Sequence, residues 1–241
     1  MMTLIDLCTC PASTCPVHTQ PIPGLQELFR GLQPEPRIAC IVIATERRRT
    51  QVWNRVVPSA QKQFDEVIVV GDWPSSDGDH EGVWDAGGNV RYTCVAPLTR
   101  STTDALIKRD VGTLMTACPV VAYLCDDHAL APGFGDALRA VLDEPWDVLV
   151  PNRCCAASGM FAATAPMEPL NNGEREAYCG GHAGVFRREV VAAKPWSAHA
   201  HHRNWDVLVS HEQQARGARF VWSPRAEITV VDLEPENRPW L

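Results

Sequence analysis

At residues 120–130 the chain reads VVAYLCDDHAL, an apolar run of strand type that ends on two carboxylates and an imidazole. An apolar run without a polar residue at every second position is typical of a strand buried on both faces of a sheet. Asp126, Asp127 and His128 therefore stand at the tip of a predicted buried strand. The rest of the sequence has to explain why charged side chains gather there.

Strand-like and helix-like segments alternate on both sides of this run. The other predicted strands are 38–44, 66–73, 90–96 and 146–151. The predicted helices have apolar faces made by Val52, Val56, Val57 and Ala60; by Ile107, Val111, Leu114 and Met115; and by Phe134, Leu138, Val141 and Leu142. Pro58 is expected to kink or split the first of them. This alternation predicts an α/β fold, in which helices flank a mostly parallel sheet.

Three of the predicted strands end on polar residues. These residues are Thr45, Glu46 and Arg47 after the first strand, Asp72 after the second, and Asp126, Asp127 and His128 after the fourth. In open α/β sheets, ligands bind beyond the carboxyl ends of parallel strands. The three tips are therefore expected to converge on one binding site.

Two adjacent carboxylates repel each other unless a cation lies beside them. At an open strand end we expect Mn²⁺ or Mg²⁺, which takes few protein oxygens and leaves positions for phosphates. Asp127 is the first candidate ligand and Asp126 the second, while a nitrogen from His128 would favour manganese. The other interpretation is that Asp126 caps the loop and that Asp127 is merely solvated.

The N-terminal segment CTCPASTCPVH supplies four zinc-type donors, Cys8, Cys10, Cys15 and His18. Four such ligands make a closed structural Zn²⁺ site, which can hold a segment too short to build a core. The alternative is a leader whose cysteines are incidental. We predict a zinc knuckle and linker over 1–36, and a main domain over 37–241 whose halves are 37–150 and 151–241.

The bulk properties exclude some classes of function. The chain has 241 residues and a formal net charge of -7, which argues against nucleic-acid binding as its sole function. It has no apolar run long enough to cross a bilayer, and its start lacks the pattern of a signal peptide. A cytoplasmic location without a membrane partner is expected.

Four elements between residues 37 and 232 together resemble the GT-A glycosyltransferases of the family-2-like type. They are IVIATERRR, VIVVGDW, VAYLCDDHAL, and GGHAGVFRREVV followed by NWDVLVSHEQQARGARFVWSP. The sequence departs from the family pattern in three places. Cys125 stands at the first position of the Asp-x-Asp element, Trp205 replaces a Glu, and Asp232 stands where a His is usual.

The resemblance implies a Rossmann-like GT-A fold and a metal-dependent, inverting transfer of a hexose or pentose to a hydroxyl. The donor would be a nucleotide-diphosphate sugar, with a UDP-sugar first in rank. Asp206 would be the general base. The residues that would contact the donor are Thr45, Glu46, Arg47, Asp72, Arg109 and Asp126. Those on the acceptor side would be Gly180, Gly181, His182 and Trp205.

Three other functions stay open at this point. A nucleotidyltransferase acting on a sugar phosphate would use a related sheet and the same metal. A zinc-containing nucleic-acid-binding module would use the N-terminal cluster and the arginines of ATERRR without catalysis. A phage-type DNA-modifying glycosyltransferase would combine both features, with a hydroxymethylated base in DNA as its acceptor.

Overall fold

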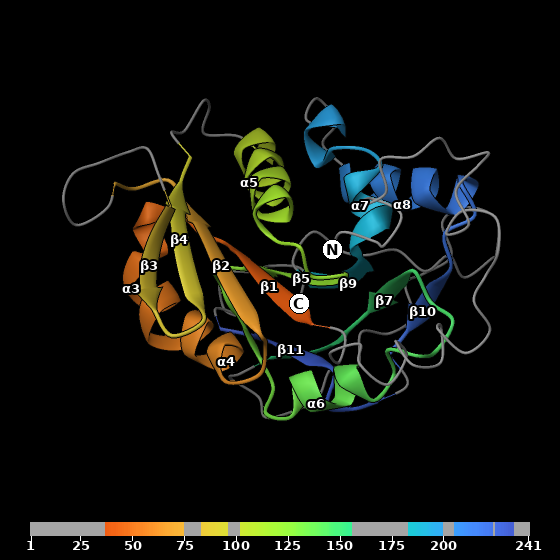
Figure 1. Ribbon diagram of the computed structural model, residues 1–241, viewed down its shortest axis with the longest axis horizontal. Coiled ribbons are helices and arrows are strands. Elements are labelled where there is room, and N and C mark those ends of the chain that lie inside the picture. Colours follow the sequence, from red (N-terminus) through yellow and green to blue (C-terminus); the bar gives the residue numbers. More distant parts are fainter. Residues whose placement is uncertain are drawn as a thin grey trace, which may run out of the picture. The chain divides into compact units, whose positions relative to one another are not determined.

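The computed structural model describes residues 37–74, 83–95, 102–155, 183–199, 205–223 and 225–233, without the side chains of 102–103, 153–155, 199 and 205–207. In this part of the chain, helices cover both faces of a large sheet (Figure 1). The predicted α/β architecture is therefore confirmed. The predicted zinc knuckle lies outside the described residues.

The large sheet has eight strands in the order β10-β7-β9-β5-β1-β2-β4-β3. Their bounds are β1 Ile38–Ile43, β2 Glu66–Gly71, β3 Val83–Gly87, β4 Val90–Cys94, β5 Val120–Cys125, β7 Val148–Val150, β9 Ala183–Arg187 and β10 Phe220–Trp222. The neighbours β5-β1-β2-β4 are parallel, as are β7 and β10. The strand β9 runs antiparallel to β5 and β7, and β3 runs antiparallel to β4. The sheet is thus mixed and mostly parallel.

The central strand β1 shows why its sequence is a continuous apolar run. All six of its residues are buried. Ile38, Cys40 and Val42 belong to the core on one face of the sheet, whereas Ala39 and Ile41 belong to the core on the other. Because side chains alternate along a strand, a sheet covered on both faces needs apolar residues at every position.

One helical layer is built from the segment after β1 and from α6. Its elements are the 3-10 helix η1 Glu46–Arg48, α3 Arg49–Gln51, the π-helix η2 Val52–Val56, α4 Val57–Gln61 and α6 Phe134–Arg139. The predicted apolar face of Val52, Val56, Val57 and Ala60 is buried, which confirms that prediction. Pro58 is the second residue of α4, directly after the π-helix's capping residue Val57, whose N–H donates to the Val52 carbonyl and so closes the wider turn. A proline has no N–H to donate, so this local irregularity is the expected split.

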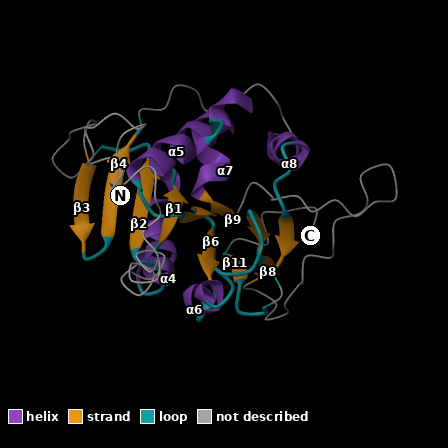
Figure 2. Cartoon of the chain, turned by 45° about the vertical axis from the view of Figure 1, so that its right-hand side comes forward, coloured by secondary structure: helices purple, strands orange, loops and turns teal. Residues whose placement is uncertain are grey.

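The other face is covered by α5 Thr102–Met115, α7 Arg188–Ala192, the 3-10 helix η3 Trp196–His199 and α8 Trp205–Ala215. The views in Figures 1 and 2 agree that α5 and α7 lie on one side of the sheet and that α4 and α6 lie on the other. The core on the α5 side includes Leu106, Val191, Trp196 and Val209.

The predicted apolar face of α5 is wrong in part. Leu114 is 80% exposed, whereas Lys108, Arg109 and Thr113 are buried. The cause is a close approach between the helix and β1: a Cβ on Gly112 would come within 2.3 Å of the Ile41 Cγ2. The helix therefore turns its glycine and two cations toward the sheet, which a search for an apolar stripe cannot detect.

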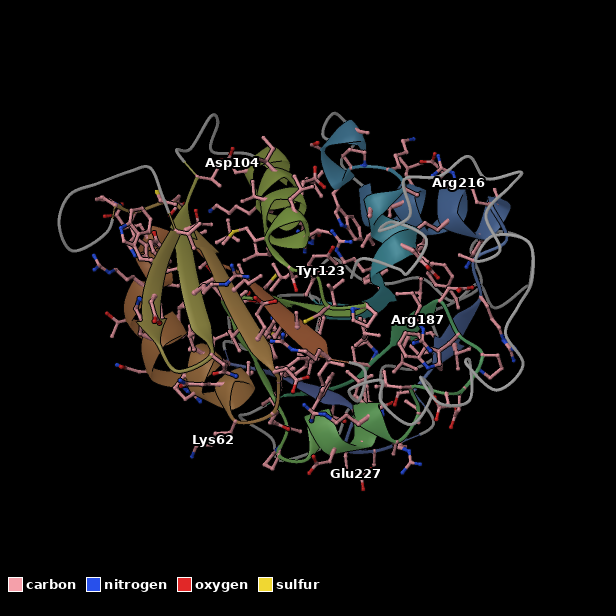
Figure 3. All side chains as sticks on the ribbon, viewed as in Figure 1. Lys62, Asp104, Tyr123, Arg187, Arg216 and Glu227 are labelled. Carbon is pink, nitrogen blue, oxygen red and sulfur yellow. The ribbon has the colours of Figure 1, made fainter. Side chains whose placement is uncertain are left out.

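Tyr123 on β5 connects the sheet with this layer (Figure 3). Its ring lies edge-on to Phe186 and to Trp196, with centroids 5.5 and 5.3 Å apart. Its hydroxyl shares a hydrogen bond of 2.6 Å with the Thr113 Oγ1 and accepts one of 3.1 Å from the Trp196 Nε1. Burial raises the pKa of Tyr123 to about 12.

A smaller sheet has the order β6-β11-β8, with bounds β6 His128–Leu130, β11 Thr229–Asp232 and β8 Asn152–Cys155 (Figure 2). The strands β3, β6 and β8 are not among the strands predicted from the sequence. These strands are short or exposed, and their sequences carry no clear apolar alternation. Among the described helices, none has the length and apolar character that a membrane crossing requires.

Candidate functional site at the strand tips

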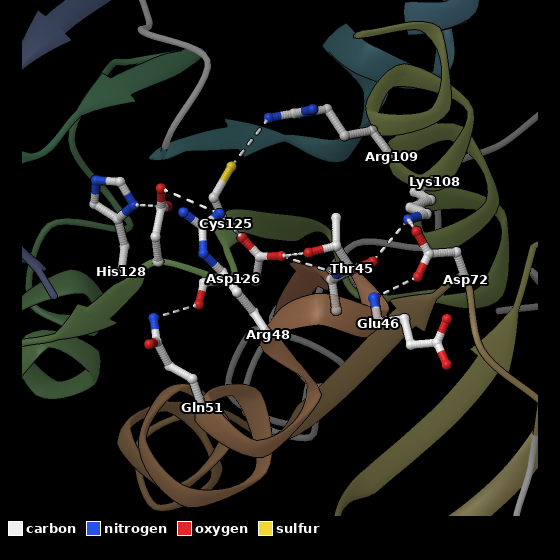
Figure 4. Close-up of polar contacts among 12 residues, drawn as sticks. Thr45, Glu46, Arg48, Gln51, Asp72, Lys108, Arg109, Cys125, Asp126 and His128 are labelled. Atoms are coloured by element: carbon white, nitrogen blue, oxygen red, sulfur yellow. Dashed lines mark hydrogen bonds and ion pairs between the residues drawn. The ribbon is translucent and has the colours of Figure 1, made fainter. Parts of the chain in front are cut away.

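The three predicted polar tips lie together at one edge of the large sheet (Figure 4). The last residue of β1, Ile43, pairs with Val70 on one side and with Cys125 on the other. Thr45, Asp72 and Asp126 follow these paired positions by one or two residues. Parallel pairing in this register is therefore what brings the tips together, while their role as one binding site stays a prediction.

Asp126 is the centre of this cluster. Its Oδ2 accepts hydrogen bonds from the Thr45 backbone N–H at 2.8 Å and from the Thr45 Oγ1 at 2.5 Å. Its backbone carbonyl accepts a bond of 3.0 Å from the Gln51 Nε2. The residue is only 4% exposed. Asp126 thus ties the segment after β1 to the tip of β5, which agrees with the second interpretation of this residue, a cap on the loop.

Arg48 completes the cluster, although it is not among the site residues predicted from the sequence. Its Nη1 donates to the Asp126 Oδ1 at 2.9 Å and lies 3.6 Å from the Asp127 Oδ2. The 3-10 turn at 46–48 directs this arginine toward the acidic pair. In a run of three adjacent arginines, the sequence alone gives no signal for which one turns inward.

Asp72 is held from two directions. Its Oδ1 accepts a bond of 2.6 Å from the Glu46 backbone N–H, and its Oδ2 accepts one of 3.1 Å from the Lys108 Nζ. Lys108 is 2% exposed and also donates to the Ala44 carbonyl at 2.7 Å. This buried ammonium links α5 to the ends of β1 and β2. The Asp72 side chain is 19% exposed, so it remains accessible to a ligand.

Arg109, a predicted donor contact, is 3% exposed and lies inside the α5 layer. Its guanidinium carbon lies 5.7 Å from the Trp196 ring centroid and 5.8 Å from that of Tyr123. Its Nη2 lies 3.9 Å from the Cys125 Sγ. Burial raises the pKa of the Cys125 thiol to about 11, and Arg109 offsets part of this effect. The thiol is therefore protonated at neutral pH and does not replace the carboxylate that the family pattern has at this position.

Asp127 and His128 form the far end of the cluster. The Asp127 Oδ1 and the His128 Nδ1 are 2.5 Å apart, and His128 is 0% exposed. On the small sheet, His128 pairs with Asp232, which is also fully buried. The Leu233 N–H donates to the Asp127 carbonyl at 2.9 Å, so β11 supports this corner of the site.

These side chains fit a divalent ion poorly. No group of three or more His, Cys, Asp or Glu residues suited to a metal occurs among the residues that the structure describes. Both Asp126 oxygens accept hydrogen bonds from the chain, Asp127 contacts His128, and an arginine lies between the two acids. The Mn²⁺ or Mg²⁺ site stays a prediction.

Several predicted site residues cannot be placed. Asp206 and Trp205 belong to the first turn of α8, but their side chains are not described. The predicted zinc and acceptor residues lie outside the described ranges; they are Cys8, Cys10, Cys15, His18, Gly180, Gly181 and His182. Arg47 is exposed and lies in η1, next to the cluster.

Solved structures of TarS from S. aureus are similar to this chain. TarS 1–349 matches with a TM-score of 0.58 at 13% sequence identity, over 83% of this chain and 61% of that chain. TarS 1–349 in complex with UDP matches with a TM-score of 0.55 at 14% identity, over 78% of this chain and 58% of that chain. The complex with UDP-GlcNAc gives 0.53 at 14% identity, over 78% and 56%. No protein-family model and no curated protein matches the chain.

This likeness concerns the fold. The mixed, mostly parallel sheet with helices on both faces is consistent with the GT-A fold that the resemblance implied. The chain covers less than two thirds of the length of each of these TarS structures.

Proposed function

We propose that this protein is a glycosyltransferase that transfers a sugar from a nucleotide-diphosphate sugar to a hydroxyl acceptor. The observation that carries the proposal is the cluster of Thr45, Asp72 and Asp126 at the carboxyl edge of the parallel strands, in a fold shared with TarS structures that hold UDP and UDP-GlcNAc. Ligands of open α/β sheets bind at this edge. A UDP-sugar is the first donor to test.

In this proposal Asp72 and the turn after β1 bind the nucleoside. Lys108 and the Glu46 N–H hold the Asp72 carboxylate in one orientation, and its partial exposure leaves it able to accept a hydrogen bond from a base or ribose. A carboxylate that two donors already fix loses little side-chain entropy when a ligand binds. Thr45, Glu46 and Arg47 would border the same nucleoside. The buried Arg109 would act at a distance, by holding Cys125 and α5 in place.

Asp206 is proposed as the general base that takes the proton of the acceptor hydroxyl. It stands in the first turn of α8, where the helix dipole favours an ionised carboxylate. A base of this kind contributes about 10²–10⁴-fold to a rate. The inverting outcome predicted from the resemblance requires this base to lie opposite the departing diphosphate.

The test is an assay of nucleotide release. Purified full-length chain is incubated with UDP-GlcNAc and related donors, and UDP is measured alongside pyrophosphate. The proposal expects UDP, and it expects Asp206→Asn to lower turnover about 10²-fold or more while UDP still binds. Arg216→Lys, at the other end of the same helix, is the matched control and should leave both unchanged.

Two results would contradict the proposal. The first is release of pyrophosphate with a sugar phosphate as co-substrate, which would indicate nucleotidyl transfer. The second is that no nucleotide-diphosphate sugar binds in calorimetry. If UDP alone fails to bind, only a uridine donor is excluded. A DNA acceptor remains a prediction that neither the described residues nor the comparisons support.

A further inference from the structure

Asp126 and Asp127, here called the acidic pair, already contact a positively charged side chain of the protein, Arg48. The Arg48 Nη1 lies 2.9 Å from the Asp126 Oδ1 and 3.6 Å from the Asp127 Oδ2. A divalent ion shared by these two carboxylates would have to lie between the same two oxygens. The guanidinium and the metal predicted from the sequence would therefore compete for one position.

Local structure fixes Arg48 in this position. Thr45 lies three residues before it and donates twice to the Asp126 side chain, while Gln51 lies three residues after it and donates to the Asp126 carbonyl. The segment that carries Arg48 is thus tied to Asp126 at both ends. A metal could displace the guanidinium only by breaking a charge-assisted hydrogen bond to a nearly buried carboxylate, which is among the stronger protein interactions.

The guanidinium is also accessible to a ligand. The Arg48 side chain is 18% exposed, compared with 6% for Asp126 and 14% for Asp127. A planar guanidinium carries five N–H donors and binds phosphate oxygens in pairs. The Arg48 guanidinium can therefore contact the two carboxylates and a bound anion at the same time.

We propose that Arg48 supplies the positive charge at the acidic pair, and that this charge, rather than a bound divalent ion, meets the diphosphate of the donor. The first half concerns the protein alone. The second half rests on the proposed function, because it needs a nucleotide-diphosphate ligand.

The first half is tested by titrating Mn²⁺ into metal-stripped full-length protein and following the free ion by electron paramagnetic resonance. The wild-type chain should show no saturable, Asp127-dependent binding below about 1 mM. Arg48→Met should bind Mn²⁺ about tenfold more tightly or better, because a unit positive charge next to the ligands is removed. Adding Asp127→Asn to that variant should abolish the gain. Only binding that depends on Asp127 is counted, so ions held by the N-terminal cysteines do not interfere.

Two further variants serve as controls. Arg55→Met removes an exposed positive charge from the same helical segment without touching the acids, and it should leave Mn²⁺ binding unchanged. Arg48→Lys keeps the charge and should keep Mn²⁺ affinity as low as in the wild type. The proposal is overturned if wild-type protein binds Mn²⁺ saturably through Asp127, or if folded Arg48→Lys gains as much affinity as Arg48→Met. If Arg48→Met does not fold, Mn²⁺ titration of the wild type and of Arg48→Lys still tests whether the acidic pair binds the metal.

The second half is tested by measuring UDP affinity in excess EDTA. Wild-type protein should bind UDP without metal, and Arg48→Met should bind it about 10–100-fold more weakly. Equal UDP affinity of the two proteins, or wild-type binding that needs added Mn²⁺, would overturn this half. If UDP fails to bind under every condition, the proposed function fails for a uridine donor, whereas the Mn²⁺ titration still decides the role of Arg48 toward the acidic pair.

Discussion

Thr45 shows how much a single side chain contributes to the site. Its hydroxyl is one of two donors to the Asp126 Oδ2, an oxygen on a residue that is 4% exposed. A buried carboxylate oxygen that loses a donor keeps its desolvation cost without the compensating bond. The hydroxyl therefore matters for stability as well as for the shape of the turn.

We expect Thr45→Val to lower the free energy of unfolding by about 1–2 kcal/mol, measured by urea denaturation. Thr45→Ser keeps the hydroxyl and should cost less than about 0.5 kcal/mol. Equal stability of the two variants would show that the bond to Asp126 contributes nothing.

Tyr123 gives a prediction on pH. Its phenol has a pKa of about 12 in the folded chain against an ordinary value of 10.0, so the folded state keeps a proton that the unfolded state loses above about pH 10. The free energy of unfolding should therefore fall as the pH rises from about 10 to about 12. Tyr123→Phe removes this contribution. Relative to wild type, it should be less stable by about 1–2 kcal/mol near pH 8, because Trp196 and Thr113 lose a partner.

The check is urea unfolding of both proteins near pH 8 and near pH 10.5. The difference in stability between them should shrink at the higher pH. A constant difference would mean that the Tyr123 phenol titrates alike in the folded and unfolded chains. Burial also raises the pKa of Cys118 and Cys94. Their titration changes the stability of the wild type and of Tyr123→Phe alike, so it does not alter the difference between the two proteins.

At this scale the sequence predicts the positions of Thr45, Asp72, Asp126 and Asp127, because each follows an apolar run that had to be a strand. The sequence does not predict that Arg48, rather than Arg47, contacts the acidic residues. The two are chemically identical neighbours, and only the angle of the 3-10 turn separates a guanidinium that faces the acids from one that faces solvent. Nor does it predict that Arg109 is buried, since arginines on helices are mostly exposed.

Among the elements, α5 is the one whose packing the sequence misrepresents. An apolar stripe pointed to Leu114 as a core residue, but the close contact of Gly112 with Ile41 sets the rotation of the helix. Two buried cations then face the strand tips, where carbonyl and carboxylate oxygens receive Lys108. The requirements of the site thus override the simplest hydrophobic arrangement.

This rotation predicts unequal effects for two alanine substitutions in α5. Gly112→Ala should destabilise the protein by about 1–3 kcal/mol, because the new methyl group overpacks against Ile41 and outweighs the gain in helix propensity. Leu114→Ala should change stability by less than about 0.5 kcal/mol, because this side chain is exposed. Thermal or urea unfolding of both variants measures this, and a more stable Gly112→Ala would contradict the packing described here.

For the molecule as a whole, apolar periodicity predicts the order of β1, β2, β4, β5 and β7 and of the helices between them. Among the elements that periodicity misses is the small sheet, because β6, β8 and β11 have only three or four residues each, and β6 begins with a buried histidine. Pairing between segments a hundred residues apart in the chain, such as β6 with β11, leaves no local signal.

The N-terminal cluster predicts a metal content for the entire chain. We expect about one Zn²⁺ per protein after purification, measured by mass spectrometry of the metal, and we expect Cys10→Ser to lower it. The ellipticity of the sheet and helices over 37–233 should persist in that variant, because both faces of the large sheet carry buried apolar cores built within this range. If purified wild-type protein contains no zinc, the predicted zinc knuckle is wrong.

In the part of the chain that is described, β3 is an edge strand of the large sheet. An outermost strand can template the addition of a strand from another molecule. Here the pairing of β3 with β4 shifts between Asp85 and Gly87, where the Gly87 N–H turns to the Asp85 Oδ1 and φ is +100°. An edge strand that is bent by such a shift and carries an aspartate pairs poorly with a strand of another molecule. This edge of the sheet therefore resists edge-to-edge aggregation when the protein is concentrated.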